Sequence, residues 1–471
     1  MRLIIKYFSI IFLFISTLIL IYVFYRSEII YKGLIRDFYV YHYLTSFILI
    51  IASLISFKIN KEIKKYLTII ILSFTFTLYS FEAYILFSKE GVSILDKKIK
   101  IYEKNNNAKY DTRTKLQIYN DLIKKDKNIV SHVSAHIFKD KEFQNRYLHP
   151  LSSVSNVHTI YCNENGYYSI YKSDKYGFNN PNSEWYSKNG IEYFLVGDSF
   201  THGACVNRPD DIGSVLRNLS KKKVLNLGWG GNGPLLQYAT LKEYLIPNVK
   251  NILWVYFEGN DLRDLRVELD IPLLKNYLND SNFTQNLKNR QNEINSLSKS
   301  IIDKKRKKID KVTQEEITNK LSYKIIKFIK LFNTRHTLFK NKRHKIYPLP
   351  EFRTDNKTSL IQDFKKILKL SKELAIQNNS NFYFVYLPRF ADDRNFNKEY
   401  YFNKEYYDVL DKKYLEVKSI LKELNIPIID IKEDFINNKY ELKKFVPFEI
   451  EGHLNVNGYK KIAEAIYRLS Q

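Results

Sequence analysis

One stretch decides the fold of this chain: IEYFLVGDSFTHGACV, residues Ile191–Val206. Its run of apolar and aromatic residues, Tyr193–Val196, predicts a buried strand, and the Gly-Asp-Ser that follows predicts a sharp turn into a helix. Ser199 is therefore expected at the carboxyl end of a strand, where open α/β sheets bind their ligands. A hydroxyl delivered there can act as a nucleophile, although Gly, Asp and Ser are also common turn residues.

Strands and helices alternate from this stretch to the end of the chain. Further strands are expected at residues 223–228, 252–257, 382–387 and 426–431, and helices at 212–219, 234–245, 360–377, 406–424 and 459–469. Because strands separated by helices form βαβ units, the pattern predicts a mainly parallel sheet covered by helices on both faces.

Three long apolar segments precede this part of the chain, at about residues 7–25, 38–57 and 66–87. Each is about as long as a helix must be to cross the hydrocarbon core of a membrane. A cleaved signal peptide is the alternative for the first segment, but no small-residue cleavage site follows it and two more spans do. We therefore expect residues 1–90 to form three transmembrane helices in contact with membrane lipid.

The lysines and arginines near these segments indicate an orientation. Arg2 and Lys6 precede the first span, and four lysines lie in the loop between the second and third spans. Because positive residues favour the cytoplasmic side, the amino terminus is expected in the cytoplasm and the large carboxyl-terminal part outside it. In a bacterium this places the protein in the inner membrane, with the large part in the periplasm.

The rest of the chain divides by composition. Residues 91–190 read as a linker followed by an accessory segment rich in tyrosine and asparagine, and residues 191–471 as the α/β domain. An insert at about 266–350 holds 20 Lys and Arg against 8 Asp and Glu, so it supplies about half of the net charge of +25. No nucleic-acid-binding motif accompanies this charge, and we expect no nucleic-acid partner.

One helical stretch of the insert, Ser322–Asn333, carries Lys324, Lys327 and Lys330 at a spacing of three residues among apolar side chains. Packing on the α/β domain is one interpretation of such a pattern. The other is that the helix lies on the bilayer surface or caps the functional site, because basic side chains are attracted to anionic lipid.

The first three strands of the α/β part each end in a cluster of polar residues or glycines: GDS at 197–199, GWGGNG at 228–233 and GND at 259–261. These ends meet at one edge of a parallel sheet. Acyl transfer needs a nucleophile, a base and donors aimed at the developing oxyanion. Ser199 can supply the nucleophile and one N–H donor, a glycine of the second cluster can bring another N–H close, and the Asn260 amide can be a third donor.

The base is expected from EGHLN, residues 451–455, which opens the last helix. His453 can reach Ser199 from a loop at the same edge, and Glu451 can orient its imidazole. His202, close to Ser199 in sequence, is expected to be a surface or structural residue, since as the base it would leave His453 without a role.

Together these blocks resemble the SGNH hydrolases, also called the GDSL family. The resemblance covers roughly 190 residues of the chain from Ile191 onward and rests on GDSF at 197–200, VLNLGWGG at 224–231, GND at 259–261 and GHLN at 452–455. It implies that Gly231, at the position of the family's oxyanion glycine, is the glycine that supplies the N–H donor. The family's usual acid lies three residues before the histidine, where this chain has Ile450. Some relatives that modify polysaccharides carry Asp two residues before it, and Glu451 would imitate that residue.

The resemblance implies a flavodoxin-like, three-layer α/β domain and ester chemistry with no metal or organic cofactor. The expected function is that of a membrane-anchored serine esterase that removes acyl groups, acetyl groups above all, from an envelope glycan or lipid. Two alternatives stay open: an O-acyltransferase that modifies a cell-surface polysaccharide with a partner membrane protein as acyl donor, and a non-catalytic binding scaffold on the same fold.

The sequence contains two cysteines, Cys162 in the accessory segment and Cys205 six residues after Ser199. Two unrelated buried thiols are the alternative to a disulfide. We expect the disulfide, because both cysteines lie among turn residues and an outer domain is in a compartment where disulfides persist.

Overall fold

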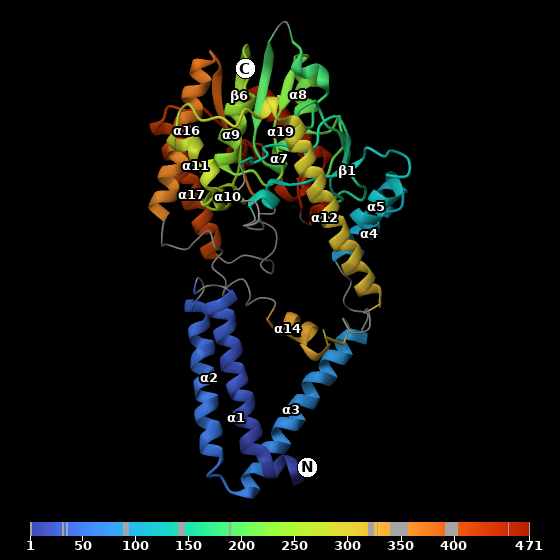
Figure 1. The fold of residues 1–471 in the computed structure, drawn as a ribbon, viewed down its shortest axis with the longest axis vertical. Helices are drawn as coiled ribbons and strands as arrows, with labels where there is room; N and C mark the ends of the chain where they lie inside the picture. The colour runs from blue at the N-terminus through green and yellow to red at the C-terminus, as the bar shows by residue number, and fades with distance from the viewer. Residues whose placement is uncertain are drawn as a thin grey trace. The chain divides into compact units, whose positions relative to one another are not determined.

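A computed structural model describes residues 2–30, 33, 36–87, 94–139, 147–187, 190–318, 325–326, 328–339, 357–390, 404–450 and 452–470. The chain forms two compact units (Figure 1). The first contains Met1–Val92 together with Glu316–Leu349, and the second contains Ser93–Glu315 together with Pro350–Gln471. Part of the basic insert thus belongs to the amino-terminal unit, although it lies between strands of the α/β domain in sequence.

The first unit contains three long apolar helices, α1 (Arg2–Phe24), α2 (Arg36–Ser56) and α3 (Lys61–Phe87). Each is long and apolar enough to cross a membrane, as the sequence predicts. A short π-helical turn, Tyr25–Ile30, continues α1, and the insert contributes α14 (Phe332–Phe339) to the same unit.

The second unit is built on a five-stranded parallel sheet. Its strands are β4 (Ile191–Val196), β5 (Val224–Asn226), β6 (Val249–Phe257), β7 (Asn381–Leu387) and β8 (Ile428–Asp430). They lie in the order β5-β4-β6-β7-β8, and every neighbouring pair is parallel. This is the flavodoxin-like order, and it confirms the predicted α/β class with a mainly parallel sheet.

Alternate side chains of each strand enter two different cores, as the two-residue period of a strand requires. Phe194 of β4 and Trp254 of β6 lie in one core, whereas Leu195 and Leu253 lie in the other. Helices on the first face are α9 (Pro234–Tyr244), α10 (Asp261–Glu268), α11 (Pro272–Asn279), α16 (Lys357–Gln377) and α17 (Lys404–Glu423); those on the second are α8 (Ile212–Ser220), α18 (Ile431–Asn437) and α19 (Val456–Leu469). The sheet is therefore the middle of three layers.

The accessory segment is mostly irregular chain with short elements. It contains α4 (Ile94–Asn106), α5 (Lys115–Leu122), 3-10 turns at Ala135–Lys139 and Asn182–Trp185, and a sheet of β1 (Val130–Ser131), β2 (His158–Ile160) and β3 (Ile170–Lys172). Helix α5 begins directly after Thr114, which caps its first turn and forms a capping box with Gln117. Phe138 and Phe178 are 1% exposed and join the segment to the core beneath the sheet.

The insert begins with α11 and continues through the long helix α12 (Gln291–Thr318). Residues 322–324 and 327 of the predicted amphipathic stretch, including Lys324 and Lys327, lie outside the described residues. The remaining short turns of the second unit are 3-10 helices at Leu287–Asn289, Leu442–Phe445 and Pro447–Glu449.

Candidate active site

Ser199 lies where the sequence places it, directly after β4. Helix α7 (Ser199–His202) is a single turn that begins at Ser199, and the Asp198 side chain caps it by accepting the Phe200 N–H at 2.8 Å. The preceding Gly197 is required by space, because a Cβ there would lie 1.9 Å from Thr201 Oγ1. The strand, the glycine and the cap together fix the serine at the carboxyl edge of the sheet.

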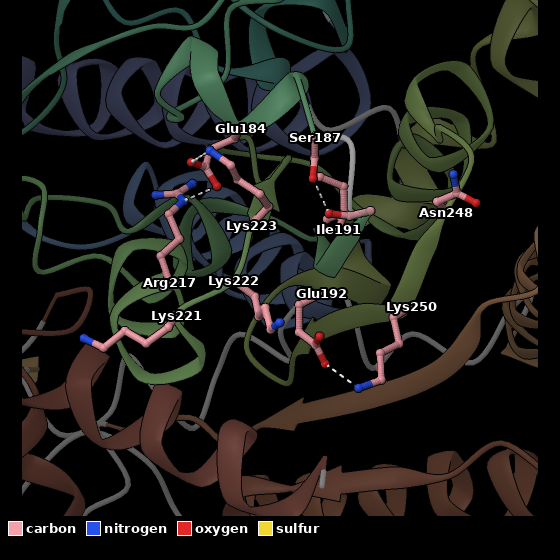
Figure 2. A pocket seen from close by; sticks show the side chains of 11 residues that line it. Glu184, Ser187, Ile191, Glu192, Arg217, Lys221, Lys222, Lys223, Asn248 and Lys250 are labelled. Carbon is pink, nitrogen blue, oxygen red and sulfur yellow. Dashed lines mark hydrogen bonds and ion pairs between the residues drawn. The ribbon is translucent and has the colours of Figure 1, made fainter.

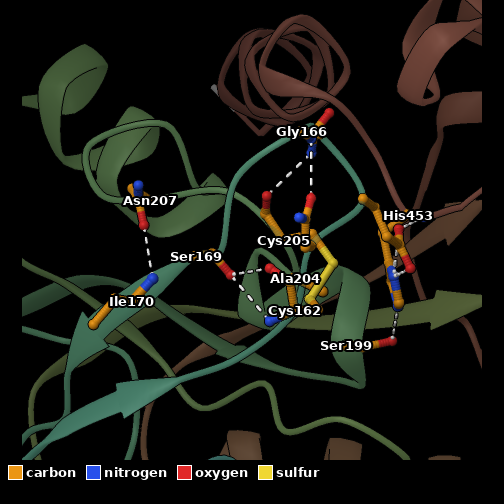
Figure 3. The surroundings of a disulfide bond; sticks show 12 residues. Cys162, Gly166, Ser169, Ile170, Ser199, Ala204, Cys205, Asn207 and His453 are labelled. Atoms are coloured by element: carbon orange, nitrogen blue, oxygen red, sulfur yellow. Dashed lines mark hydrogen bonds and ion pairs between the residues drawn. A yellow bond between two sulfur atoms is a disulfide. The ribbon is translucent and has the colours of Figure 1, made fainter. Parts of the chain in front are cut away.

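His453 reaches Ser199 from the other end of the chain. Its Nε2 lies 2.9 Å from Ser199 Oγ, although 254 residues separate the two in sequence (Figure 3). The loop that carries His453 is held by the start of α19, where Asn455 accepts the Gly458 N–H at 2.9 Å. The structure therefore brings together the predicted nucleophile and the predicted base.

The carboxylate beside His453 is Glu164, which the sequence did not suggest. Its oxygens lie 3.0 and 3.1 Å from His453 Nδ1, and one of them accepts the His453 backbone N–H at 2.5 Å. Glu451, the predicted acid, lies outside the described residues. With Nδ1–H donating to Glu164, Nε2 is left to accept the proton of Ser199, which is the arrangement of a Ser-His-acid triad.

Gly452 makes room for this carboxylate. A Cβ at that position would lie 2.6 Å from Glu164 Oε2, and the residue has a φ of +126°, which side-chain-bearing residues rarely adopt. The Gly-His pair of the last block thus has a local reason here: the glycine admits an acid that comes from a distant part of the chain.

The turn that carries Glu164 is fastened at several points. Cys162 and Cys205 form a disulfide with a Cα–Cα distance of 5.0 Å, within the usual range (Figure 3). Asn165 donates its side-chain amide to the Cys205 carbonyl at 3.1 Å, and Asn163 donates to the Asp111 carbonyl at 2.7 Å. The disulfide joins the turn of the acid to the chain just after the nucleophile's helix.

Hydrogen bonds also join the accessory segment to the glycine loop after β5, residues 228–233. Three successive loop residues bond to it: the Trp229 indole N–H donates to the Val133 carbonyl at 2.8 Å, the Gly230 carbonyl accepts the Ala135 N–H at 2.9 Å, and the Gly231 carbonyl accepts Lys139 Nζ at 2.7 Å. The C=O and N–H of a trans peptide point in opposite directions. Since the Gly230 carbonyl points at the Ala135 N–H, the Gly231 N–H points away from Ala135.

Lys139 is held in place by a second partner. Its side chain is only 4% exposed, and its Nζ lies 2.9 Å from Glu268 Oε1. Glu268 in turn accepts the N–H groups of Gly233, Leu235 and Leu236 at the start of α9. The peptides that flank Gly231 are therefore fixed from both sides before any substrate binds.

Asn260, the other predicted oxyanion donor, lies at the start of α10 after β6. Its side-chain amide donates to Asp264 Oδ2 at 3.0 Å. The strands β5 and β6 are both direct neighbours of β4, so Gly231 and Asn260 follow the strands on either side of the one that ends at Ser199. The structure thus places all three predicted oxyanion residues on one edge of the sheet.

His136 is a second imidazole at this edge. A Cβ on Gly231 would lie 2.7 Å from its Cδ2 and 2.9 Å from its Nε2, so the ring lies directly against the glycine. The side chain is 51% exposed, and its Nδ1 lies 4.0 Å from Asp264 Oδ1. No sequence pattern distinguishes His136, because it belongs to a short 3-10 turn in irregular chain.

The two charged partners of the triad shift each other's pKa. Burial would lower the pKa of His453, but the hydrogen bond and the charge of Glu164 outweigh it and hold this pKa above its usual value. Burial would raise the pKa of Glu164, yet its bonds to His453 keep that pKa below its usual range. Glu164 is therefore charged at neutral pH and stabilises the imidazolium form of His453.

Two further carboxyls lie buried below the serine. Burial, with a contribution from the charge of Asp264, raises the pKa of Asp198 to about 6. Burial and the charge of Asp198 raise the pKa of Asp261 well above its usual value. Burial therefore favours the uncharged form of both carboxyls.

His202 is buried, 2% exposed, with its Nδ1 3.2 Å from the Gly228 carbonyl. Its ring packs against Tyr161 and Tyr171 of the accessory segment, with centroids 4.7 Å away from each. Burial lowers the pKa of His202 to about 4, so it is neutral. These contacts make it a packing residue rather than a base.

One group of side chains among the described residues has ligand atoms close enough together to hold a metal ion: Glu164, Cys205 and His453. Its sulfur belongs to the disulfide, and the Glu164 carboxylate already bonds to the imidazole. A metal ion at this place would have to break those bonds, so the residues do not fit one.

A basic pocket of about 470 Å³ lies at the opposite edge of the sheet, around the amino ends of β4, β5 and β6 (Figure 2). Its cations include Arg217, Lys223 and Lys250. Glu184 lies 3.3 Å from both Arg217 and Lys223, and Glu192 lies 2.8 Å from Lys250. The pocket is thus partly neutralised by its own carboxylates, and it is separate from the triad.

No protein-family model matches this chain, and no curated protein matches its sequence. Solved structures do resemble it. A protein assigned to the G-D-S-L lipolytic family, from Desulfitobacterium hafniense, is 13% identical, with 59% of this chain and 99% of that protein covered and a TM-score of 0.30.

An acetylxylan esterase from Geobacillus stearothermophilus is 11% identical, and a variant of an acetyl-xylooligosaccharide esterase from Geobacillus is 13% identical. Both comparisons cover 60% of this chain and 96% of the other, each with a TM-score of 0.30. What the site of this chain can do therefore rests on its own geometry.

Proposed function

We propose that this protein is a membrane-anchored serine esterase that removes acyl groups, acetyl groups above all, from an envelope glycan or lipid. One observation carries the proposal: Ser199 Oγ, His453 and Glu164 form a continuous chain of contacts at the carboxyl edge of the sheet. Such a chain is how a serine hydroxyl becomes a nucleophile at neutral pH.

The reaction begins when Ser199 Oγ attacks the ester carbonyl and gives its proton to His453 Nε2. The imidazolium that forms is stabilised by the Glu164 carboxylate at Nδ1. The negative charge on the former carbonyl oxygen is met by N–H donors at the sheet edge, for which the Ser199 and Gly231 N–H groups and the Asn260 amide are the candidates.

Collapse of this intermediate breaks the ester bond. His453 gives its proton to the leaving alcohol, and the acyl group stays on Ser199. A water then repeats the sequence: His453 takes its proton, the water oxygen attacks the acyl-serine, and the carboxylic acid leaves as Ser199 recovers its proton. No step needs a metal or an organic cofactor.

Two observations support an extracytoplasmic, membrane-bound location. Helices α1, α2 and α3 are long and apolar enough to cross a membrane. The Cys162–Cys205 disulfide lies beside the triad, and disulfides persist mainly outside the cytoplasm. An enzyme held there would meet acylated polymers and lipids of the envelope.

An O-acyltransferase is the second candidate, because a sugar hydroxyl can replace water in the second half of the reaction. It would need a partner membrane protein to deliver acyl groups. The non-catalytic scaffold is disfavoured by the assembled triad, since a binding protein has no need of the contact between Ser199 and His453.

The full chain in detergent micelles, assayed on an activated acetyl ester, tests the proposal. Ser199→Ala should lower kcat by roughly 10⁴-fold or more, because it removes the nucleophile of the triad. A fluorophosphonate should label the wild type and not the variant. An unchanged rate in Ser199→Ala would refute esterase and acyltransferase together, whereas an acyl-serine that passes only to an added sugar would favour the transferase.

A further inference from the structure

Helix α3 carries an acidic side chain in its apolar stretch. The candidate span runs from Lys61 to Leu86, and Glu82 lies five residues before the end of the helix at Phe87. Its side chain is fully buried. An ionisable residue within a membrane helix is costly unless it is paired, so the partner of Glu82 indicates what this part of the helix does.

The partner is the first turn of α14. Glu82 Oε1 accepts the Asn333 N–H at 3.0 Å and its side-chain amide at 3.0 Å, while Oε2 accepts the Thr334 N–H at 2.6 Å. The first N–H groups of a helix have no partner within the helix and carry partial positive charge. The Glu82 carboxylate and the first N–H groups of α14 therefore provide each other with hydrogen-bond partners that hydrocarbon could not supply.

A second contact lies three residues earlier on α3. The Tyr79 hydroxyl donates to the Ile329 carbonyl at 2.8 Å, and its ring lies 5.4 Å from that of Phe328. The described residues of the insert from 325 to 339 and α3 belong to one compact unit. Tyr79 and Glu82 therefore hold the insert along one face of the helix, and Figure 1 shows α14 beside α3.

The docked segment turns apolar side chains outward. Ile325, Ile326 and Ile329 are 48%, 47% and 59% exposed, and Phe74 and Phe76 of α3 are 65% and 75% exposed. Exposed apolar side chains that adjoin a membrane-crossing helix have one natural occupant, the acyl chains of the lipid that surrounds that helix. Lys330 and Arg335 are also exposed, and side chains of this kind can extend their charged ends toward lipid headgroups.

We propose that residues 325–326 and 328–339 of the insert are a second membrane-embedded element, docked on α3 through Glu82 and Tyr79, with Ile325, Ile326 and Ile329 in contact with lipid acyl chains. The proposal sharpens the expectation that the insert meets the bilayer, and it does not depend on the esterase activity. It also explains the acidic residue within α3: Glu82 caps the amino end of α14, a helix of the basic insert.

Tryptophan fluorescence in liposomes that contain brominated acyl chains tests the proposal. The three native tryptophans, Trp185, Trp229 and Trp254, are all at most 7% exposed and lie in the second unit, so they give a constant background. Ile326→Trp should add emission that brominated lipid quenches. Ile325→Trp provides a second site if Ile326→Trp fails to fold.

Leu415→Trp is the matched control, because Leu415 is a 64% exposed aliphatic residue of α17 in the second unit. Quenching of Ile326→Trp should exceed that of Leu415→Trp, and Glu82→Ala in the Ile326→Trp background should reduce it. Glu82→Gln, which keeps one acceptor oxygen, should reduce it less. Equal quenching of the two tryptophan variants would overturn the proposal, and so would quenching that Glu82→Ala leaves unchanged.

Only the purified chain and lipid are present in these liposomes, so lipid and a second copy of the chain are the two possible occupants of the apolar face. If a second copy covered this face, quenching would fall as the protein density in the membrane rises. Quenching that is constant over protein density supports lipid as the occupant, and a fall with density contradicts it.

Discussion

The candidate active site joins two regions of the second unit that are built on different principles. The carboxyl edge of the sheet supplies Ser199 and His453 on turns that follow or precede regular elements. The accessory segment supplies Glu164, His136 and Lys139 from irregular chain held by side-chain bonds and one disulfide. The nucleophile and the base are thus held by the α/β fold itself, whereas the acid and the contacts that fix the glycine loop come from the accessory segment packed on it.

The largest loss of activity is expected from Glu164→Gln. An amide cannot stabilise the imidazolium, and it can hold His453 in the wrong tautomer, so kcat should fall by roughly 10⁴-fold, as removal of the acid does in other triads. The control is Glu451→Gln, which changes the acid that the sequence suggests and should leave kcat nearly unchanged. Assays of both variants on the same activated ester would show which region supplies the acid.

A large effect on stability is expected from Lys139→Met. The substitution leaves Glu268 buried without its cation and frees the Gly231 carbonyl, and breaking a buried ion pair commonly costs about 3 to 5 kcal/mol. Chemical unfolding monitored by fluorescence measures the loss. Lys221→Met is the control, because Lys221 is exposed and its Nζ donates to the Asn218 side chain at 2.8 Å. Equal stability of the two variants would contradict the role given to Lys139.

A somewhat smaller loss is expected when the disulfide is removed. Replacing both Cys162 and Cys205 with Ser removes a cross-link between residues that are 43 positions apart in sequence. The chain-entropy model puts the resulting loss of unfolding free energy at roughly 3 to 4 kcal/mol. Since the same bond holds the turn of Glu164, kcat should fall as well, and reduction of the wild type should reproduce the fall. A variant that loses stability but keeps full kcat would mean that the hydrogen bonds of Asn163 and Asn165 hold the turn by themselves.

The smallest effect is expected from His136→Ala. If the imidazole beside Gly231 bonds to substrate, its loss should cost about 1 kcal/mol of transition-state binding, which is roughly fivefold in kcat/KM. His158→Ala is the control, since His158 is equally exposed in the accessory segment and pairs with Asp126 away from the triad. If the two variants change kcat/KM by the same factor, His136 does not contact the substrate.

The sheet and its edge could be predicted because their signals are local. Apolar runs ending in glycine predict strands such as β4, and the turn residues after them predict where Ser199, Gly231 and Asn260 lie. Even the glycine before His453 was visible in the sequence, although its reason, the space for the Glu164 carboxylate, was not. The amino-terminal helices were predictable for the same reason, since length and hydropathy alone define them.

The acid could not be predicted because nothing local marks it. Glu164 lies among turn residues, 289 residues before His453, and only the folded chain brings the two together. Its one sequence signal was indirect: Cys162 two residues before it and Cys205 six residues after Ser199 joined its turn to the nucleophile. A disulfide expected near a site is therefore a reason to examine the charged residues beside both cysteines.

The pH dependence of kcat/KM in wild type, Glu164→Gln and Glu451→Gln tests the central claim most directly. His453 must be neutral to act as a base, and Glu164 raises its pKa, so the wild-type rate should rise with pH through a value above the usual 6.5 or so of histidine. Glu164→Gln should shift this rise to lower pH together with its loss of rate, while Glu451→Gln should keep the wild-type profile. A shift in Glu451→Gln with none in Glu164→Gln would contradict the account.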